Sequence, residues 1–236
     1  MNLRGCVALV TGASRTGQAG EAVAAALLRE GACLVLAARH AEGLRQVADG
    51  LAAPAGSLRT QAADLSREEE VEVLFRDLAA REGRVDILVH AAGGLTQYGP
   101  MESQSLAGIE AEWRSNFVTA FLVLRAGLPV MKRDGWGRAV LFTSAAVENP
   151  KPLMSAYLAA KTAVAALVRV AALEYAGTGV AVNAVAPTIL DTGQNRREMG
   201  ERGASQWVPL ERMVKAVLRL ADPGTHVESG QIITLV

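Results

Sequence analysis

The chain has few of the residues that build metal centres and disulfide frameworks. Its 236 residues include two cysteines, Cys6 and Cys33, each within an apolar segment, and three histidines that form no cluster with them. Such sparse cysteine usage argues against a disulfide scaffold, and a zinc site needs several Cys or His ligands at defined spacing. We therefore expect two buried thiols in a reducing cytosol and no metal.

Long runs of one residue type are also missing. The 24 basic residues equal the 24 acidic ones in number and are scattered, so no nucleic-acid partner is expected. The N-terminal apolar stretch is too short for a signal sequence and breaks at a glycine-rich turn. We expect no apolar run of the roughly 20 residues that span a membrane, and hence a cytoplasmic, soluble protein with no membrane partner.

Short apolar runs alternate with longer helical patterns from end to end. The apolar runs predict seven strands, at residues 7–10, 33–37, 58–62, 87–90, 139–143, 180–185 and 231–235. Helical patterns lie between them, at residues 21–30, 42–51, 68–82, 109–132, 155–175 and 210–220. This alternation is typical of a parallel sheet with helices on both faces. We predict a single domain over residues 1–236, an α/β fold with a Rossmann-like, doubly wound, seven-stranded parallel sheet.

One segment departs from the alternation. Residues 192–208 are less periodic, carry many charges and several glycines, and precede a helical pattern. A loop of this kind is the best candidate for a flap that covers a substrate site, although an ordinary surface loop fits the same residues.

The most informative residues are a serine, a tyrosine and a lysine. Tyr157 and Lys161 are four residues apart in an Ala- and Leu-rich run without Gly or Pro, so they share one face of a helix. An ammonium beside a phenol favours the phenolate, and we expect it to lower the tyrosine pKa from about 10. Ser144, from a different segment, is a candidate to hold the substrate oxygen. The trio predicts proton exchange with an alcohol or carbonyl, and therefore redox chemistry that needs a hydride carrier.

The first predicted strand runs into a glycine-rich turn followed by a helical pattern. The turn reads TGASRTGQAG and contains Gly12, Gly17 and Gly20. A strand, a glycine turn and a helix start cradle a pyrophosphate, because backbone N–H groups and the positive end of the helix face the anion. A glycine cluster alone is weak support, but its place after the first strand of an alternating chain points to a dinucleotide site.

The end of the second predicted strand bears on the choice of dinucleotide. NAD-binding folds place a carboxylate there for the ribose hydroxyls, whereas this chain has Ala38 followed by Arg39. An arginine pairs with a 2′-phosphate, and Arg15 in the glycine turn is a candidate to reach the same group. We therefore predict a preference for NADP(H), with NAD(H) as the alternative.

Taken in order, these and further motifs resemble the short-chain dehydrogenase/reductase family over about residues 3–233. The matching segments are Thr11-Gly12, Asp64-Leu65, His90-Ala91-Ala92-Gly93, Asn116, Ser144, Tyr157-Leu158-Ala159-Ala160-Lys161 and Asn183-Ala184-Val185-Ala186-Pro187-Thr188. The resemblance implies a nicotinamide-dependent oxidoreductase that acts on a small-molecule carbonyl or alcohol.

The resemblance also implies a role for each catalytic residue. Tyr157 is the expected acid/base at the substrate oxygen, and Ser144 is expected to hydrogen-bond and orient that oxygen. Lys161 is expected to lower the tyrosine pKa and to bind the nicotinamide ribose. Asn116 is expected to position a water that links Lys161 to solvent.

The same resemblance implies a set of cofactor contacts at the ends of the predicted strands. They are Gly12, Ser14, Arg15, Gly17, Ala19, Gly20, Arg39, Asp64, Leu65, Ala91, Ala92, Gly93, Tyr157, Lys161, Pro187, Ile189 and Thr192. Among them, Ile189 and Thr192 match positions that bind the carboxamide.

The chain departs from the family pattern at several positions. Its glycine turn is longer than the usual TGxxxGxG and has Gln18 in place of the middle glycine, a spacing similar to that of the enoyl reductase branch. That branch places six residues between its Tyr and Lys, and this chain has three, so we reject enoyl reduction. Ala91 replaces an asparagine, and Thr188 replaces a glycine, of the usual pattern.

The substrate stays open at this point. A 3-oxoacyl thioester and a small-molecule ketone, sugar or polyol are candidates. A C=N system is another, because Ala92-Gly93-Gly94 and the late flap loosely resemble dihydropteridine-reductase-like members. A catalytically silent NADP-sensing or scaffold protein is an alternative of another class, and the complete catalytic set argues against it. The family pairs the helices of Asn116 and Tyr157 between subunits, so a homodimer or homotetramer is expected.

Overall fold

The computed structural model describes all 236 residues and contains one sheet of seven parallel strands. The strands are β1 (Val7–Thr11), β2 (Cys33–Ala38), β3 (Leu58–Ala62), β4 (Ile87–His90), β5 (Gly137–Phe142), β6 (Val180–Pro187) and β9 (Ile232–Leu235). Their order is β3-β2-β1-β4-β5-β6-β9, so the chain builds outward from β1, returns to the centre, and builds outward again from β4. The predicted doubly wound, Rossmann-like α/β fold in a single domain is confirmed.

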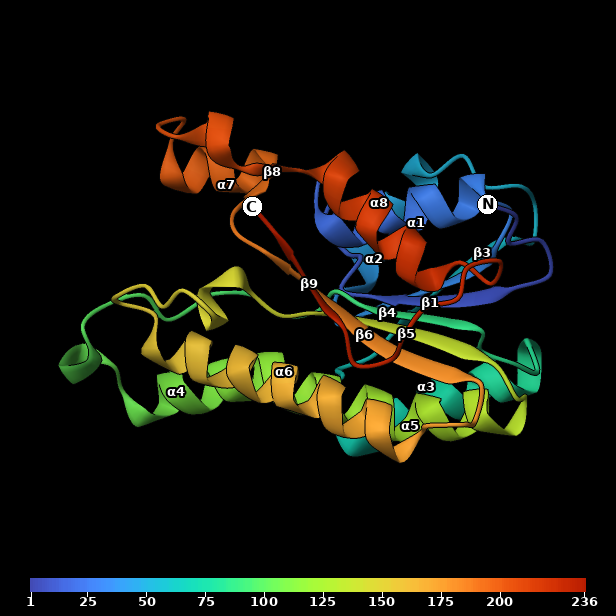
Figure 1. The fold of residues 1–236 in the computed structure, drawn as a ribbon. Coiled ribbons are helices and arrows are strands. Elements are labelled where there is room, and N and C mark those ends of the chain that lie inside the picture. The colour runs from blue at the N-terminus through green and yellow to red at the C-terminus, as the bar shows by residue number, and fades with distance from the viewer.

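Helices cover both faces of this sheet, as Figure 1 shows. One layer consists of α1 (Ala19–Arg29), α2 (Ala41–Gly50) and α8 (Leu210–Ala221), and the other of α3 (Glu68–Arg81), α4 (Leu106–Trp113), α5 (Thr119–Arg133) and α6 (Ser155–Glu174). Apolar clusters of 25 and 24 buried residues occupy the two faces, so both are covered to the same extent. Successive strand residues therefore serve different cores: Leu9 belongs to one cluster and Val10 to the other.

The long helical pattern predicted at 109–132 is found as two helices joined by one π-helical turn. It begins earlier than predicted, at Leu106, because the Ser105 hydroxyl caps α4 by accepting a hydrogen bond from Gly108 N at 3.1 Å. The π turn, Arg114–Val118, contains Asn116. Such single turns inside α-helices are frequent at functional sites.

The segment predicted as a flap, residues 192–208, contains structure that its sequence pattern did not reveal. It holds α7 (Gly193–Met199) and is bounded by β7 (Leu190–Asp191) and β8 (Val208–Pro209). These two short strands pair in parallel and so close the segment into a loop that is anchored at both ends. In Figure 1, α7 and β8 project from the main body near the C-terminus of the chain.

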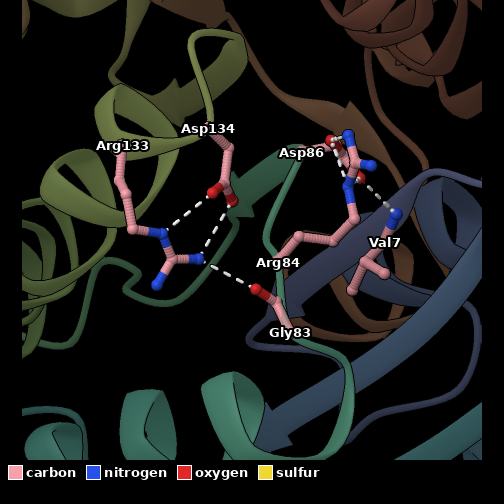
Figure 2. A network of polar contacts seen from close by, with 6 residues as sticks. All are labelled: Val7, Gly83, Arg84, Asp86, Arg133 and Asp134. Carbon is pink, nitrogen blue, oxygen red and sulfur yellow. Dashed lines mark hydrogen bonds and ion pairs between the residues drawn. The ribbon is translucent and has the colours of Figure 1, made fainter.

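Polar contacts tie together the opposite, amino-terminal end of the sheet (Figure 2). The Asp86 carboxylate is buried, accepts a hydrogen bond from Val7 N at 2.8 Å and pairs with Arg84 at 2.5 Å. Arg133, at the end of α5, donates to Gly83 O at 2.8 Å. These contacts hold the starts of β1 and β4 together, so the carboxyl ends of the same strands lie side by side where such folds bind ligands.

Helix α6 contradicts the expectation that no segment of the chain is long and apolar enough to span a membrane. By length and composition, its 20 residues at a mean hydropathy of 1.6 are apolar enough to cross a membrane, and it is the one helix for which this holds. The helix lies against the sheet in Figure 1, and its Val164 and Val168 side chains are part of the buried core. Core packing accounts for the apolar composition of this face of α6.

Candidate active site

Four strands end close together at the carboxyl edge of the sheet. β1 leads into Gly12, β4 into Ala91-Ala92-Gly93 and β5 toward Ser144, and β6 ends at Pro187. β1 and β4 are neighbours at the point where the strand order reverses, which is where α/β sheets of this type bind ligands. Predicted site residues that are far apart in the sequence therefore share one edge of the fold.

Helix α6 presents Tyr157 and Lys161 on one face, with the Lys161 Nζ atom 5.8 Å from the centre of the Tyr157 ring. Lys161 is only 5% exposed, and its Nζ donates to Phe142 O at 2.8 Å. In the same region, Thr143 Oγ1 donates to Lys161 O at 2.9 Å. These two bonds lock α6 against the end of β5, so the helix of Tyr157 lies beside the segment that continues to Ser144.

The ionisation of Tyr157 differs from the prediction. Burial raises the pKa of Tyr157 above its usual value of 10.0; a hydrogen bond with Ser144 lowers it, and the charge of Glu112 raises it further. The Lys161 ammonium, engaged with Phe142 O, is not among the causes. The expected net lowering of the tyrosine pKa is therefore not found in this arrangement, and the contribution of Lys161 to it stays a prediction.

Lys161 itself is strongly perturbed. Burial lowers its pKa from 10.5 to about 8, against the charge of Glu112, which raises it. A lysine in this state changes charge close to neutral pH, which is the property required of a group that takes part in proton transfer.

Asn116 fixes the loop that follows β4. Its side chain is buried, with Oδ1 accepting from Gly94 N at 3.1 Å and Nδ2 donating to Gly94 O at 3.0 Å. Nδ2 also lies 3.0 Å from Glu112 O. The side chain is thus occupied by protein partners, and the water-positioning role expected of this residue stays a prediction.

Glu112, one helical turn before Asn116, is not among the residues predicted from the sequence. It is fully buried, and its carboxylate accepts hydrogen bonds from the Asn116 side chain at 3.2 Å and from Gln97 N at 3.2 Å. Nothing in the sequence distinguishes it from the exposed Glu110 on the same helix except its spacing of four from Asn116.

His90 joins three elements beneath the site. Thr11 Oγ1 lies 2.9 Å from its Nδ1, and Thr119 Oγ1 lies 3.2 Å from its Nε2. Because Thr119 Oγ1 donates to Ser115 O at 2.9 Å, it accepts from Nε2–H, and Nδ1 then accepts from Thr11. This neutral tautomer agrees with the pKa of His90, which burial and the Lys161 charge lower to about 3. The residue holds β1, β4 and α5 together.

The glycine turn after β1 has the features of a pyrophosphate cradle. Gly12 has φ +75°, and a Cβ there would lie 2.5 Å from Ala92 N, while a Cβ on Gly20 would lie 2.7 Å from Gly12 O. Gln18 begins α1 without a side-chain cap, so the first N–H groups of the helix are free to face an anion. Gly17 N already donates to the Glu21 carboxylate. The turn fits the pyrophosphate of a nicotinamide dinucleotide.

The residues predicted for the adenosine end surround the start of α2. A Cβ on Gly43 would lie 2.2 Å from Ser14 O, so the first turn of α2 packs directly on the glycine turn. Arg39 is exposed, and its charge acts on the Asp64 carboxylate. Burial raises the pKa of Asp64, but the hydrogen bonds from Ser66 and the charge of Arg39 outweigh this effect, so the pKa is lowered overall. Leu65, next in the chain, is buried.

Arg15 reaches the flap. Its guanidinium donates to the Gln194 side chain of α7 at 3.2 Å, so the glycine turn and the flap are in contact. At the base of the flap, Ile189 O accepts from Val208 N at 2.7 Å, and the buried Thr192 hydroxyl caps α7. The carboxamide contacts expected of Ile189 and Thr192 stay predictions, because the Ile189 carbonyl and the Thr192 hydroxyl form hydrogen bonds within the flap in this structure.

A sequence profile described as short chain dehydrogenase matches residues 6–202, which include the glycine turn, Asn116, Ser144, Tyr157 and Lys161. The chain belongs to the short-chain dehydrogenase family. It is 34% identical to D-threitol dehydrogenase of Mycolicibacterium smegmatis over 80% of its own length and 72% of the relative's. It is 30% identical to D-beta-hydroxybutyrate dehydrogenase of Cupriavidus necator over 98% and 87% of the two chains. The crystal structure of levodione reductase has a TM-score of 0.91 at 26% identity and covers 99% and 97% of the two chains.

This membership confirms two predictions. The family assignment is correct, and the enzyme is an oxidoreductase of the class that acts between CH–OH and C=O groups, with a nicotinamide dinucleotide as cofactor and a small molecule as substrate.

A surface cavity of about 620 Å³ near Arg138 and Gly179 contains none of the predicted site residues and lies at the opposite end of β5.

Proposed function

We propose that this dehydrogenase uses NADP(H) to interconvert a ketone and a secondary alcohol, with Asn116, Ser144, Tyr157 and Lys161 as its catalytic set. The observation that carries the proposal is the placement of Tyr157 beside the buried Lys161, whose Nζ donates to the last residue of β5 just before Ser144, at the sheet edge that also holds the glycine turn. The relatives are named as dehydrogenases of hydroxybutyrate and threitol and as a reductase of levodione. These names support a small hydroxy or keto compound over a 3-oxoacyl thioester.

Tyr157 exchanges the proton with the substrate oxygen. In the reducing direction its neutral hydroxyl donates to the carbonyl oxygen, and burial favours this neutral form because it raises the tyrosine pKa. In the oxidising direction the same group has to accept a proton, so turnover rises with pH. Ser144 holds the substrate oxygen next to the Tyr157 hydroxyl as negative charge develops on it. The nicotinamide dinucleotide, when bound, supplies or accepts the hydride.

Lys161 supports this proton transfer. Its Nζ is close enough to the Tyr157 ring to turn from Phe142 O toward the phenol and a ribose hydroxyl, and a positive charge there stabilises the phenolate that remains after the proton has left. In this role Asn116 positions a water that returns a proton from solvent to Lys161. The ammonium, with a pKa of about 8, gives up and regains a proton readily near neutral pH.

The preference for NADP(H) rests on the start of α2. Its N-cap, His40, makes no side-chain hydrogen bond, so the first backbone N–H groups of the helix are free beside the exposed Arg39. Arg15 lies in the adjoining turn, and β2 ends at Ala38 without a carboxylate to repel a phosphate. The ratio of kcat/KM for NADPH to that for NADH tests this point: a value above about 10 is expected, and a preference for NADH contradicts it.

A substrate screen tests the reaction itself. Wild-type protein is mixed with NADPH and a panel of small ketones, keto acids, cyclic diones and one 3-oxoacyl thioester, and with NADP⁺ and the matching alcohols and polyols. We expect turnover with at least one non-thioester pair. Tight NADPH binding without turnover across the whole panel would instead support the silent, NADP-sensing alternative.

We also propose a homo-oligomer, a cytoplasmic location and a flap function for residues 192–208. Apolar side chains are exposed on the layer that holds the catalytic set: Phe121 is 42% exposed, Val170 50% and Leu173 78%. Two copies that join through α5 and α6 remove these surfaces from water. Elution as a monomer in gel filtration contradicts this. The expectation of two buried thiols is wrong, because Cys33 is exposed and Cys6 is partly buried. Both thiols are free, which suits a reducing compartment.

A further inference from the structure

A buried carboxylate that the proposed reaction does not use lies behind the catalytic set. Glu112 is 0% exposed, although a carboxylate is among the groups least often buried without a partner. It belongs to α4, which packs against α6, the helix of Tyr157 and Lys161. A fully buried charge at this position requires a reason in either folding or function.

Hydrogen bonds show what the Glu112 carboxylate holds. Oε2 accepts from Thr96 N at 3.1 Å, from the Thr96 hydroxyl and from Gln97 N at 3.2 Å, and Oε1 accepts from Asn116 Nδ2 at 3.2 Å. All of these partners are neutral donors, an arrangement that suits an ionised carboxylate, which only accepts. The carboxylate thereby fastens the loop after β4, at Thr96 and Gln97, to the same helix that carries Asn116.

The loop also contacts α4 at a second point. A Cβ on Gly108, one turn before Glu112, would lie 2.5 Å from the Gln97 Oε1 atom, so the Gln97 side chain packs directly over the helix backbone. The next residue, Tyr98, is 66% exposed. Glu112 and Gly108 thus hold the loop against α4 at Thr96 and Gln97.

The charge of Glu112 also acts on both titratable catalytic residues. It raises the pKa of Tyr157, in addition to the effect of burial, and it raises the pKa of Lys161, against the effect of burial. The other charged or titratable group that faces Lys161 is His90 on β4, which burial keeps neutral. Glu112 is thus the negative charge that α4 directs at these two residues of α6.

We propose that Glu112 is a positioning residue of this enzyme: its buried carboxylate fixes the Thr96–Gln97 loop and Asn116 behind the catalytic set. Because α4 packs against α6, the negative charge of the same carboxylate also acts on the proton exchange of Tyr157, and this is its charge role. The charge role rests on the proposed function, whereas the loop role does not. The substitution Glu112→Gln keeps the size of the side chain and removes the charge. Glu110→Gln, on the exposed side of the same helix, is the matched control.

The first test reads the Tyr157 phenol without any turnover. Tyr157 is one of three tyrosines, so ultraviolet titration of wild type and Tyr157→Phe by difference assigns its transition. We expect Glu112→Gln to move this transition to lower pH by about half a unit or more, because a nearby negative charge that opposes the phenolate is gone. Glu110→Gln should leave it in place. An unchanged or raised transition in Glu112→Gln overturns the charge role.

The second test applies the same comparison to turnover. The acid limb of the pH profile of kcat/KM for alcohol oxidation should move to lower pH in Glu112→Gln and stay in place in Glu110→Gln. A fall in kcat with an unmoved limb identifies a merely structural residue and overturns the charge role. Absence of wild-type turnover speaks against the proposed function, and the phenol titration then decides the charge role of Glu112 by itself.

A third test needs no variant and so does not depend on whether Glu112→Gln folds. Amide hydrogen exchange in the wild-type protein should be slow at Thr96 and Gln97, which donate to the carboxylate. Leu95 and Tyr98, their neighbours, have no hydrogen-bond acceptor for their amides and should exchange faster. Equal exchange rates at all four amides overturn the loop role.

Discussion

Replacing Lys161 by methionine should abolish turnover and make the folded protein more stable. Lowering a lysine pKa from 10.5 to about 8 opposes folding by about 3 kcal/mol at pH 7, since one pKa unit corresponds to about 1.4 kcal/mol. The ammonium is nearly fully buried, so solvent screening does not reduce this figure much. Methionine fills a similar volume and adapts its shape, but leaves Phe142 O without its donor at a cost of about 1 kcal/mol. The expected net stabilisation is about 2 kcal/mol.

The pH dependence of this effect has a definite sign. Between pH 8 and 10.5 the unfolded chain keeps the lysine proton while the folded protein has released it, so the stability of the wild type rises with pH in this window. Below pH 8 both states hold the proton and the full penalty applies. The advantage of Lys161→Met should therefore be greatest at pH 7 and shrink as the pH approaches 10.5.

Urea unfolding at pH 7, 8.5 and 10, at one protein concentration, measures these differences. Lys215→Met, an exposed lysine on α8, is the control and should change stability little at any pH. The reasoning is refuted if Lys161→Met is less stable than the wild type at pH 7, or if the difference between them does not change with pH.

Three further substitutions address the cofactor and substrate contacts. Arg39→Asp should lower kcat/KM with NADPH by about tenfold or more, as steady-state kinetics will show, without a comparable loss with NADH; equal losses would point to misfolding. Gly12→Ala places a Cβ 2.5 Å from Ala92 N at φ +75°, so thermal unfolding should begin at lower temperature and NADPH affinity should fall; a variant with wild-type Tm contradicts the packing. Ser144→Ala should reduce kcat about a hundredfold with NADPH affinity retained, and loss of both together would mean a structural role.

The doubly wound parallel sheet and the positions of the proposed catalytic residues follow from local signals in the sequence. Strands such as Val7–Thr11 are buried on both faces and so appear as continuous apolar runs, and the spacing of Tyr157 and Lys161 is set by the helix repeat alone. By contrast, β7 and β8 have two residues each, too few for any periodic pattern. Their pairing brings Leu190 next to Val208, and the segment between these residues has no periodic pattern from which this contact could be predicted.

The electrostatics of the site were less predictable than its geometry. The sequence places an ammonium near Tyr157, but whether the tyrosine pKa falls or rises depends on burial and on where the ammonium points, and these are properties of the packed structure. The role of Glu112 could not be predicted from the sequence for the same reason, because it depends on contacts that form only in the packed structure. Its main partners are backbone amides of Thr96 and Gln97, which every sequence carries.

The central claim is that Tyr157 exchanges a proton with a carbonyl or alcohol oxygen, and Tyr157→Phe tests it most directly. The measurement is the single-turnover rate with a substrate found in the screen, together with the NADPH dissociation constant from cofactor fluorescence. The phenyl ring keeps the packing on α6 and removes only the hydroxyl. We predict a rate loss of about a thousandfold or more, on the scale of general acid–base catalysis, with the dissociation constant within about twofold of the wild type. A variant that turns over at a rate close to that of the wild type contradicts the account.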